Sequence, residues 1–337
     1  MIPASPHYFM ENAMWKYVLK RLLWLIPVII GVTLLVFALM NVKPGDPGRV
    51  YLGLNASQEA VDAYNDSLGL NDPFFIRYLN YMKGLVHLDF GKSWVGGESV
   101  NDRILTALPL TLKVCLLAII VSFITGIPIG VLSAVRQYSA ADRILTILAM
   151  ILACIPVFWL CNMAAILFTL KLHWLPAVGL DTPRAYVMPV VCTAANTIGL
   201  TVRMSRSSMM DEMRKDYIRT ARAKGSKEVS VILKHSLRNS LIPVTTMLGV
   251  NFSLLMGGTV FVESVYSIQG LGNLIVKSIS NNDVPMLTGC VVVLAIFSVI
   301  VNLLVDILYA YLDPRIKAKY VGPAKRKKPR KLQKGVV

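Results

Sequence analysis

Uncharged apolar stretches long enough to cross a lipid bilayer dominate this chain of 337 residues. Leu22–Met40 is a run of 19 residues without a charged side chain, and Val114–Val135 is a second run of the same kind. An α-helix rises about 1.5 Å per residue, so such a run spans a hydrocarbon core of about 30 Å. Because 55% of the residues are hydrophobic and only 16% are charged, we expect an all-α polytopic membrane protein.

The first apolar run follows Lys16, Lys20 and Arg21, an arrangement shared by signal peptides and by membrane helices that begin in the cytoplasm. The run is long, and it carries no small-x-small cleavage pattern at its end. We therefore expect residues 1–21 to form a cytoplasmic N-terminus and residues 22–40 to remain as the first transmembrane helix.

Five further apolar segments complete a pattern of six spans. The fourth of the six is the weakest, because it contains Pro189, Asn196 and Gly199. Including it places 25 basic residues on the side of both termini and nine on the other side, as expected when cytoplasmic loops carry the excess of lysine and arginine. We predict six transmembrane helices with cytoplasmic N- and C-termini. The five further spans are 114–135, 144–170, 185–202, 240–262 and 284–312.

Two polar segments lie outside these spans. Residues 41–107 are expected to be an extracytoplasmic helical segment that opens with a rigid turn, Pro44-Gly45-Asp46-Pro47. Residues 313–337 are rich in lysine and arginine, and we expect them to form a basic cytoplasmic tail near anionic lipid. The core between them, residues 108–312, holds the second to sixth spans and a basic loop at 203–241.

The centre of that loop, Asp216–Pro243, reads DYIRTARAKGSKEVSVILKHSLRNSLIP. It predicts a helix that ends at Gly225, because glycine readily adopts the left-handed conformation found at helix ends. Ser226 is expected to cap a second helix that runs through residues 234–240. Two cationic helices joined at a glycine are suited to contact a protein outside the membrane, or to lie as a basic hairpin on anionic lipid.

Asp216–Gly225, together with the following Leu237-Arg238-Asn239, resembles the cytoplasmic EAA loop of the membrane subunits of ABC importers. The likeness is closest to the dipeptide, oligopeptide and nickel permease family, in which arginine stands at the position of Arg219. The PGDP turn that contains Asp46 also resembles this family. So does the segment 265–272, although it has Gln269 where the family usually has proline.

This resemblance implies a type I ABC-importer permease that forms half of a translocation pathway, in a bacterial or archaeal cytoplasmic membrane. It implies a second permease, two ATPase subunits that bind ATP and Mg²⁺, and an extracytoplasmic substrate-binding protein. Di- or oligopeptides are the expected substrates, with nickel chelates or glutathione as alternatives. The residues expected to couple to the ATPases are Asp216, Tyr217, Arg219, Thr220, Ala221, Arg222, Ala223, Lys224, Gly225, Arg238 and Asn239. The residues expected to face the binding protein are Gly45, Asp46, Gly270 and Gly272.

Polar residues within the spans leave two interpretations open. Asn162, Asn196, Asn251 and Asn302 either line the pathway or form hydrogen bonds between helices. Asp306, in the last span, either serves transport or pairs with a cation near the headgroups, and we favour the second interpretation.

Catalytic and metal-binding motifs are not found in the sequence. The four histidines have no metal-ligand spacing, and we find neither a phosphate-binding loop nor a catalytic motif. We therefore do not expect an enzyme. The basic residues flank apolar segments, so we do not expect a nucleic-acid partner either. A secondary transporter is the alternative class, but it would normally show internal repeats and ion-coupling carboxylates at mid-membrane.

Overall fold

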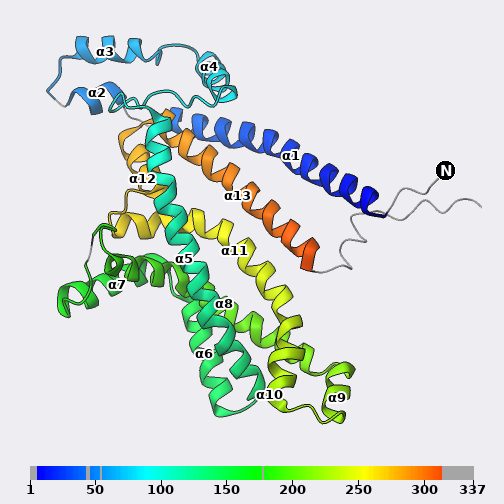
Figure 1. Ribbon diagram of the computed structural model, residues 1–337. Coiled ribbons are helices and arrows are strands. Elements are labelled where there is room, and N and C mark those ends of the chain that lie inside the picture. The colour runs from blue at the N-terminus through cyan, green and yellow to red at the C-terminus, as the bar shows by residue number, and fades with distance from the viewer. Residues whose placement is uncertain (1–5, 43–45, 54, 177, 313–337) are drawn as a thin grey trace, which may run out of the picture.

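A computed structural model of the chain describes residues 6–42, 46–53, 55–176 and 178–312. Within these residues the repetitive secondary structure is helical (Figure 1). The helices are α1 (Pro6–Val42), α2 (Pro47–Leu52), α3 (Gln58–Ser67), α4 (Phe74–Val86), α5 (Val100–Val135), α6 (Ala140–Cys154), α7 (Val157–Ala164), η1 (Ala165–Lys171), η2 (Pro183–Tyr186), α8 (Val187–Met213), α9 (Asp216–Ala223), α10 (Glu228–Ser230), η3 (Val231–Ser236), α11 (Leu237–Val265), α12 (Leu271–Asn281) and α13 (Val284–Leu312).

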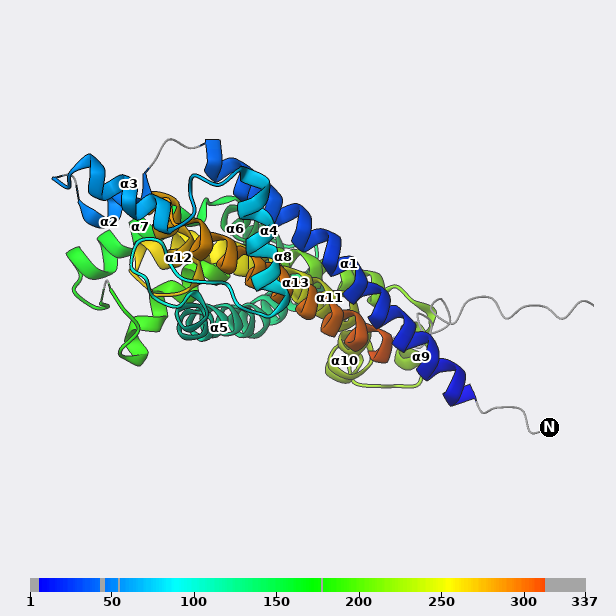
Figure 2. The same ribbon diagram turned by 90° about the horizontal axis from the view of Figure 1, so that it is seen from above.

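The long helices connect two ends of the molecule. Helices α2–α4 and α12 gather at one end, called here the α12 end, and α9 and α10 lie at the other, called the α9 end (Figure 1). Helix α1 lies along α13 in both views (Figures 1 and 2). Side chains of α1 such as Leu23 and Trp24 are exposed. In the described residues, five helices are long and apolar enough to cross a membrane.

The third expected span, 144–170, is not one straight helix. It consists of α6 followed by α7 and η1, and the chain bends by 99° between these two parts. The break falls at Ile155, which has an extended backbone, and at Pro156, which precedes α7. Proline disfavours helical geometry in the residue before it and cannot donate the next backbone hydrogen bond. Counted as one broken span, this pair brings the candidate spans among the described residues to six, the number predicted.

Helix α8, which contains the weakest apolar segment, is the most deeply buried candidate span. In its apolar window 67% of the residues are buried, against 17% in Leu22–Met40. Four small hydroxyl side chains, spaced four residues apart, form one buried stripe along it. These are Thr193, Thr197, Thr201 and Ser205. The polar residues that weaken the hydropathy signal therefore lie against protein rather than lipid.

Glycines on α5 allow this stripe to pack closely. A Cβ atom on Gly126 would lie 2.7 Å from the Thr201 side chain, and one on Gly130 would lie 2.6 Å from the Val202 carbonyl oxygen. On α8 itself, a Cβ on Gly199 would lie 2.4 Å from the backbone oxygen of Ala149 in α6. Small residues at helix contacts let backbones approach within the membrane, where dispersion contacts and hydrogen bonds hold helices together. Helices α5, α6 and α8 thus form one tightly packed unit.

The basic loop and the fifth span are continuous. Helices α10 and α11 are joined through the π-helical segment η3, which gives one helix from Glu228 to Val265. The predicted second helix through 234–240 and the predicted span at 240–262 are thus parts of one helix. Ser226 does not cap this helix, because the cap position is Lys227 and no side chain makes a capping hydrogen bond there.

The close packing of α5 against α8 predicts an asymmetric response to alanine substitution. Gly130→Ala should destabilise the protein by about 1–3 kcal/mol, because the added methyl group meets backbone atoms that cannot move aside. Gly31→Ala in α1 is the matched control, since a Cβ there meets nothing within 4 Å. Thermal unfolding in detergent measures both variants. Equal unfolding temperatures for the two would contradict this account.

Candidate functional site

Helix α9 stands out from the bundle at the α9 end (Figure 1). Ile218 is fully buried and is the one residue of α9 in the buried class. Asp216 lies in its first turn and Arg222 in its last turn, an arrangement that complements the helix dipole. This helix therefore presents charged and polar side chains to its surroundings from a single apolar anchor.

Tyr217 connects α9 to both neighbouring long helices. Its hydroxyl donates to Glu212 of α8 at 2.6 Å and accepts from the side-chain amide of Asn239 in α11 at 2.9 Å. Burial and the hydrogen bond to Glu212 raise the pKa of Tyr217 above its usual range. These two hydrogen bonds join α9 to the ends of α8 and α11 together.

The turn after α9 depends on Gly225. Its φ angle is +78°, and a Cβ atom there would meet nothing within 4 Å, so backbone conformation rather than space requires glycine. Arg222 and Glu228 close the turn with two hydrogen bonds of 3.1 and 2.7 Å. Both side chains are about half exposed, so this ion pair orients the turn more than it stabilises the fold.

The structure brings the eleven predicted coupling residues together at the α9 end. Ala221 is half-buried and the other ten are exposed. Arg219 lies 3.8 Å from Asp216, a long contact that leaves its guanidinium largely free to meet another surface. The remaining exposed members are Thr220, Ala223, Lys224 and Arg238.

The asparagines in the spans form hydrogen bonds to backbone carbonyl groups. Asn196 of α8 donates to the Ala153 carbonyl in the last turn of α6, where carbonyls lack partners within the helix. It therefore stabilises the bend between α6 and α7. Asn162, Asn251 and Asn302 each donate to the carbonyl four residues earlier in their own helix, at 2.8, 2.9 and 2.8 Å. Asp306 belongs to α13, and its side chain lies outside what the structure describes.

A buried carboxylate that the sequence analysis missed organises the α12 end. Glu263, near the end of α11, is fully buried. It accepts from the Thr111 hydroxyl of α5 at 2.6 Å and from the backbone N–H of Asn273 at 3.1 Å. Asn273 lies in the first turn of α12, so the Glu263 carboxyl group accepts a backbone N–H that has no partner within that helix. Its position directly after an apolar run was the available sequence signal.

Two glycines predicted to face the binding protein pack closely against Glu263. A Cβ on Gly270 would lie 2.5 Å from the Glu263 carboxyl group, and one on Gly272 would lie 2.6 Å from the Val260 backbone. Gly270 and Gly272 therefore let the start of α12 approach α11 closely. Both glycines are buried. The prediction that they form part of a face for a binding protein stays untested.

Asp46 and Asp283 each cap a helix at the α12 end. Asp46 precedes α2, accepts from the Arg49 N–H at 3.2 Å, and accepts from the Asn65 side chain at 2.8 Å. Asp283 precedes α13, accepts from the Trp94 N–H at 3.1 Å, and receives a hydrogen bond from Ser93. Burial raises the pKa of Asp283, against the lowering effect of these hydrogen bonds. Gly45 and the tail at 313–337 lie outside the described residues.

Comparison with known proteins finds relatives that match most of the chain. The chain is 36% identical over 332 residues to a dipeptide transport system permease protein of Alkalihalophilus pseudofirmus, covering 90% of this chain and 100% of that protein. It is 39% identical over 312 residues to a putative peptide transport system permease protein of Brucella abortus, covering 90% and 99%. It is 37% identical over 306 residues to a glutathione transport system permease protein of Salmonella choleraesuis, covering 91% and 100%.

The fold is also similar to a solved structure. An inward-facing structure of the methionine ABC transporter MetNI matches with a TM-score of 0.54 at 19% identity, over 63% of this chain and 96% of that chain. The helical bundle with its protruding α9 is thus the fold of an ABC-importer membrane subunit. Residues 126–318 match the model of the family described as "Binding-protein-dependent transport system inner membrane component", and residues 14–115 match its N-terminal companion. The chain belongs to this family of permease subunits.

The Glu263 contacts predict that Gly270→Ala loosens the α12 end. The added methyl group would collide with the carboxylate, and we expect a loss of about 1–3 kcal/mol in stability. Cys290, which is buried against α12 in the same hydrophobic cluster, provides a reporter. Its thiol should react faster with a small alkylating reagent in Gly270→Ala, as quantified by peptide mass spectrometry. Gly258→Ala, where a Cβ meets nothing within 4 Å, should leave its reactivity unchanged.

Proposed function

We propose that this chain forms half of the translocation pathway of an ATP-driven importer of di- or oligopeptides. The observation that carries the proposal is the exposed helix α9, anchored by Ile218 and joined through Tyr217 to the ends of α8 and α11. A helix held this way can transmit a displacement to two spans at once. The substrate class is supported by relatives named for dipeptide, peptide and glutathione transport.

In this proposal the α9 end faces the cytoplasm and receives two ATPase subunits. The sequence has no G-x-x-x-x-G-K-[ST] loop, and the partners would bind ATP and Mg²⁺ and carry out hydrolysis. A second, related permease would complete the pathway. The α12 end would face outward in a bacterial or archaeal cytoplasmic membrane, where α2–α4 and α12 would receive a substrate-binding protein. When the ATPases close on ATP, the α9 helices of both permeases would approach each other and tilt the spans.

Co-purification tests the proposed assembly. The chain is isolated from its own membranes in mild detergent, and its partners are identified by mass spectrometry. We expect a second six-span permease and one or two proteins that carry the phosphate-binding loop. Any co-purified binding protein is then assayed with dipeptides, longer peptides, glutathione and nickel chelates. Recovery of the chain alone, under conditions that keep other ABC importers intact, would favour the secondary-transporter class instead.

The geometry of Gly225 predicts a selective loss of ATPase binding. Gly225→Val should leave the chain in the membrane but lower ATPase recovery on the order of tenfold, because a β-branched residue is strained at positive φ and would re-aim α9. Gly97→Val is the matched control, since Gly97 also has a positive φ, +65°, with open space around it, and lies far along the chain from α9. Equal ATPase recovery from both variants would show that the turn does not set the docking geometry.

A further inference from the structure

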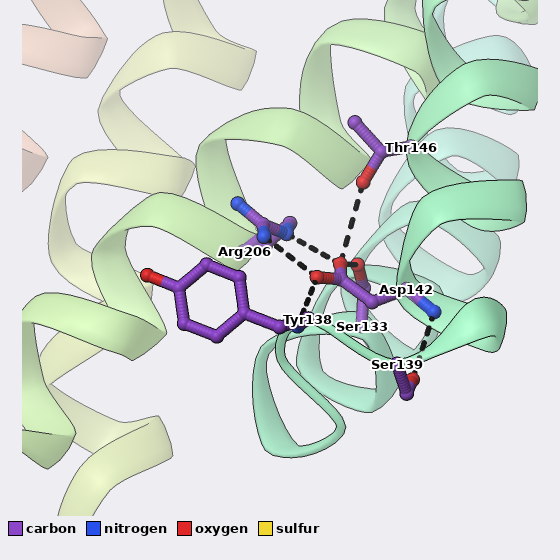
Figure 3. Close-up of polar contacts among 6 residues, drawn as sticks. All are labelled: Ser133, Tyr138, Ser139, Asp142, Thr146 and Arg206. Atoms are coloured by element: carbon purple, nitrogen blue, oxygen red, sulfur yellow. Dashed lines mark hydrogen bonds and ion pairs between the residues drawn. The ribbon is translucent and has the colours of Figure 1, made fainter.

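A buried ion pair lies at the α9 end, apart from the proposed docking surface. Asp142, in the first turn of α6, is 3% exposed. Its carboxylate accepts hydrogen bonds from the Ser133 hydroxyl of α5 and from the Tyr138 N–H, the latter at 2.8 Å. Figure 3 shows these groups converging on it from the turn between α5 and α6. This carboxylate therefore fixes the α5–α6 turn from within.

Arg206 of α8 approaches the same carboxylate from the opposite side (Figure 3). Its Nε and Nη2 atoms donate to the two carboxylate oxygens of Asp142 at 2.7 and 2.8 Å. Such a two-point contact between a guanidinium and a carboxylate fixes relative orientation as well as distance. Both oxygens of Asp142 are thus fully used, and α8 is bound to the α5–α6 turn in one register.

The position of this pair along α8 is what suggests a role in transport. Arg206 lies two turns before Met213, the last residue of α8, and α9 begins at Asp216. A displacement of α9 therefore enters α8 close to Arg206. The ion pair adds to the close packing of α8 and resists sliding of α8 past the α5–α6 turn, because separation would leave the buried carboxylate of Asp142 without its partner.

A cavity of about 430 Å³ lies beside the pair and is lined by Arg203, Arg206 and Ser207 of α8, Thr146 of α6 and Met247 of α11. Helix α8 also contacts α11 at this level, since Met204 packs against the buried side chains of Val244 and Leu248. The ion pair therefore binds α8 to α6 close to the point where α6, α8 and α11 meet.

We infer that Asp142 and Arg206 are positioning residues that make α5 and α6 follow α8 when the ATPases displace α9. This inference rests on the proposed function. Without the pair, α8 would move while α6, which leads into the bent segment at Pro156, would lag behind. ATP hydrolysis would then continue with less substrate moved per ATP. A purely structural pair would instead change stability and leave this ratio constant.

The test uses the complete importer in proteoliposomes, with its second permease, ATPases and binding protein. Asp142→Asn keeps the side-chain shape and removes the charge, and Arg206 is partly exposed, so it can reach water. We expect the number of substrate molecules transported per ATP to fall about tenfold, while assembly and hydrolysis persist. Arg206→Lys keeps the positive charge opposite Asp142, so it should lower the number of substrate molecules transported per ATP less than Asp142→Asn does. Asp211→Asn, at an exposed position of the same helix, is the matched control and should not alter it.

A distance measurement tests the same inference in the protein that keeps both Asp142 and Arg206. Spin labels are placed at the exposed positions Ile147 of α6 and Arg214 after α8, with the exposed Cys154 replaced by serine. The distance between them should stay constant when ATP is added, and it should become ATP-dependent in Asp142→Asn. An ATP-driven change in the otherwise intact protein would overturn the inference. An unchanged transport ratio in Asp142→Asn would do so as well.

The two proposals fail in different ways. If the unsubstituted complex shows no ATP-driven uptake, the proposed function fails and the inference falls with it. If that complex transports substrate and Asp142→Asn transports as much per ATP, only the role of the ion pair is overturned.

Discussion

The close approach of α8 to α5 and α6 is the constraint on which the rest of this structure depends. It requires glycine at Gly126, Gly130 and Gly199, where any larger residue would collide with a neighbouring helix. Association of helices in lipid gains little from the hydrophobic effect, so close packing and polar contacts must supply the attraction. Helix α8 therefore sits at the centre, and α9, which follows it after two residues, inherits a rigid base.

The sequence predicted the local features of the fold and missed those that depend on distant contacts. The first span, the glycine turn at Gly225 and the exposure of α9 follow from composition and backbone preferences within a few residues. The bend at Pro156 does not, because proline is tolerated inside many membrane helices and the angle depends on neighbours such as Asn196.

The functional residues divide in the same way. The predicted coupling residues lie mostly in one stretch, Asp216–Gly225, so the pattern that predicts them is local. The carboxylates of Glu263 and Asp142 have partners 152 and 64 residues away, and nothing in the local pattern indicates Thr111 or Arg206 as those partners. The asparagines in the spans show a different limit of sequence analysis. The sequence shows that these residues are polar, but it does not show whether the side chain bonds to a backbone carbonyl group or lines the pathway.

The helix 228–265 connects the two ends that the proposed function must couple. At the α9 end Asn239 joins it to Tyr217, and at the α12 end Glu263 joins it to α5 and α12. An unbroken helix transmits rotation and tilt better than two helices joined by a loop. Its π-helical segment, η3, lies between the exposed start and the span, where a locally wider turn can absorb bending. Polar contacts at both ends thus join this helix to the elements that the proposed function must couple.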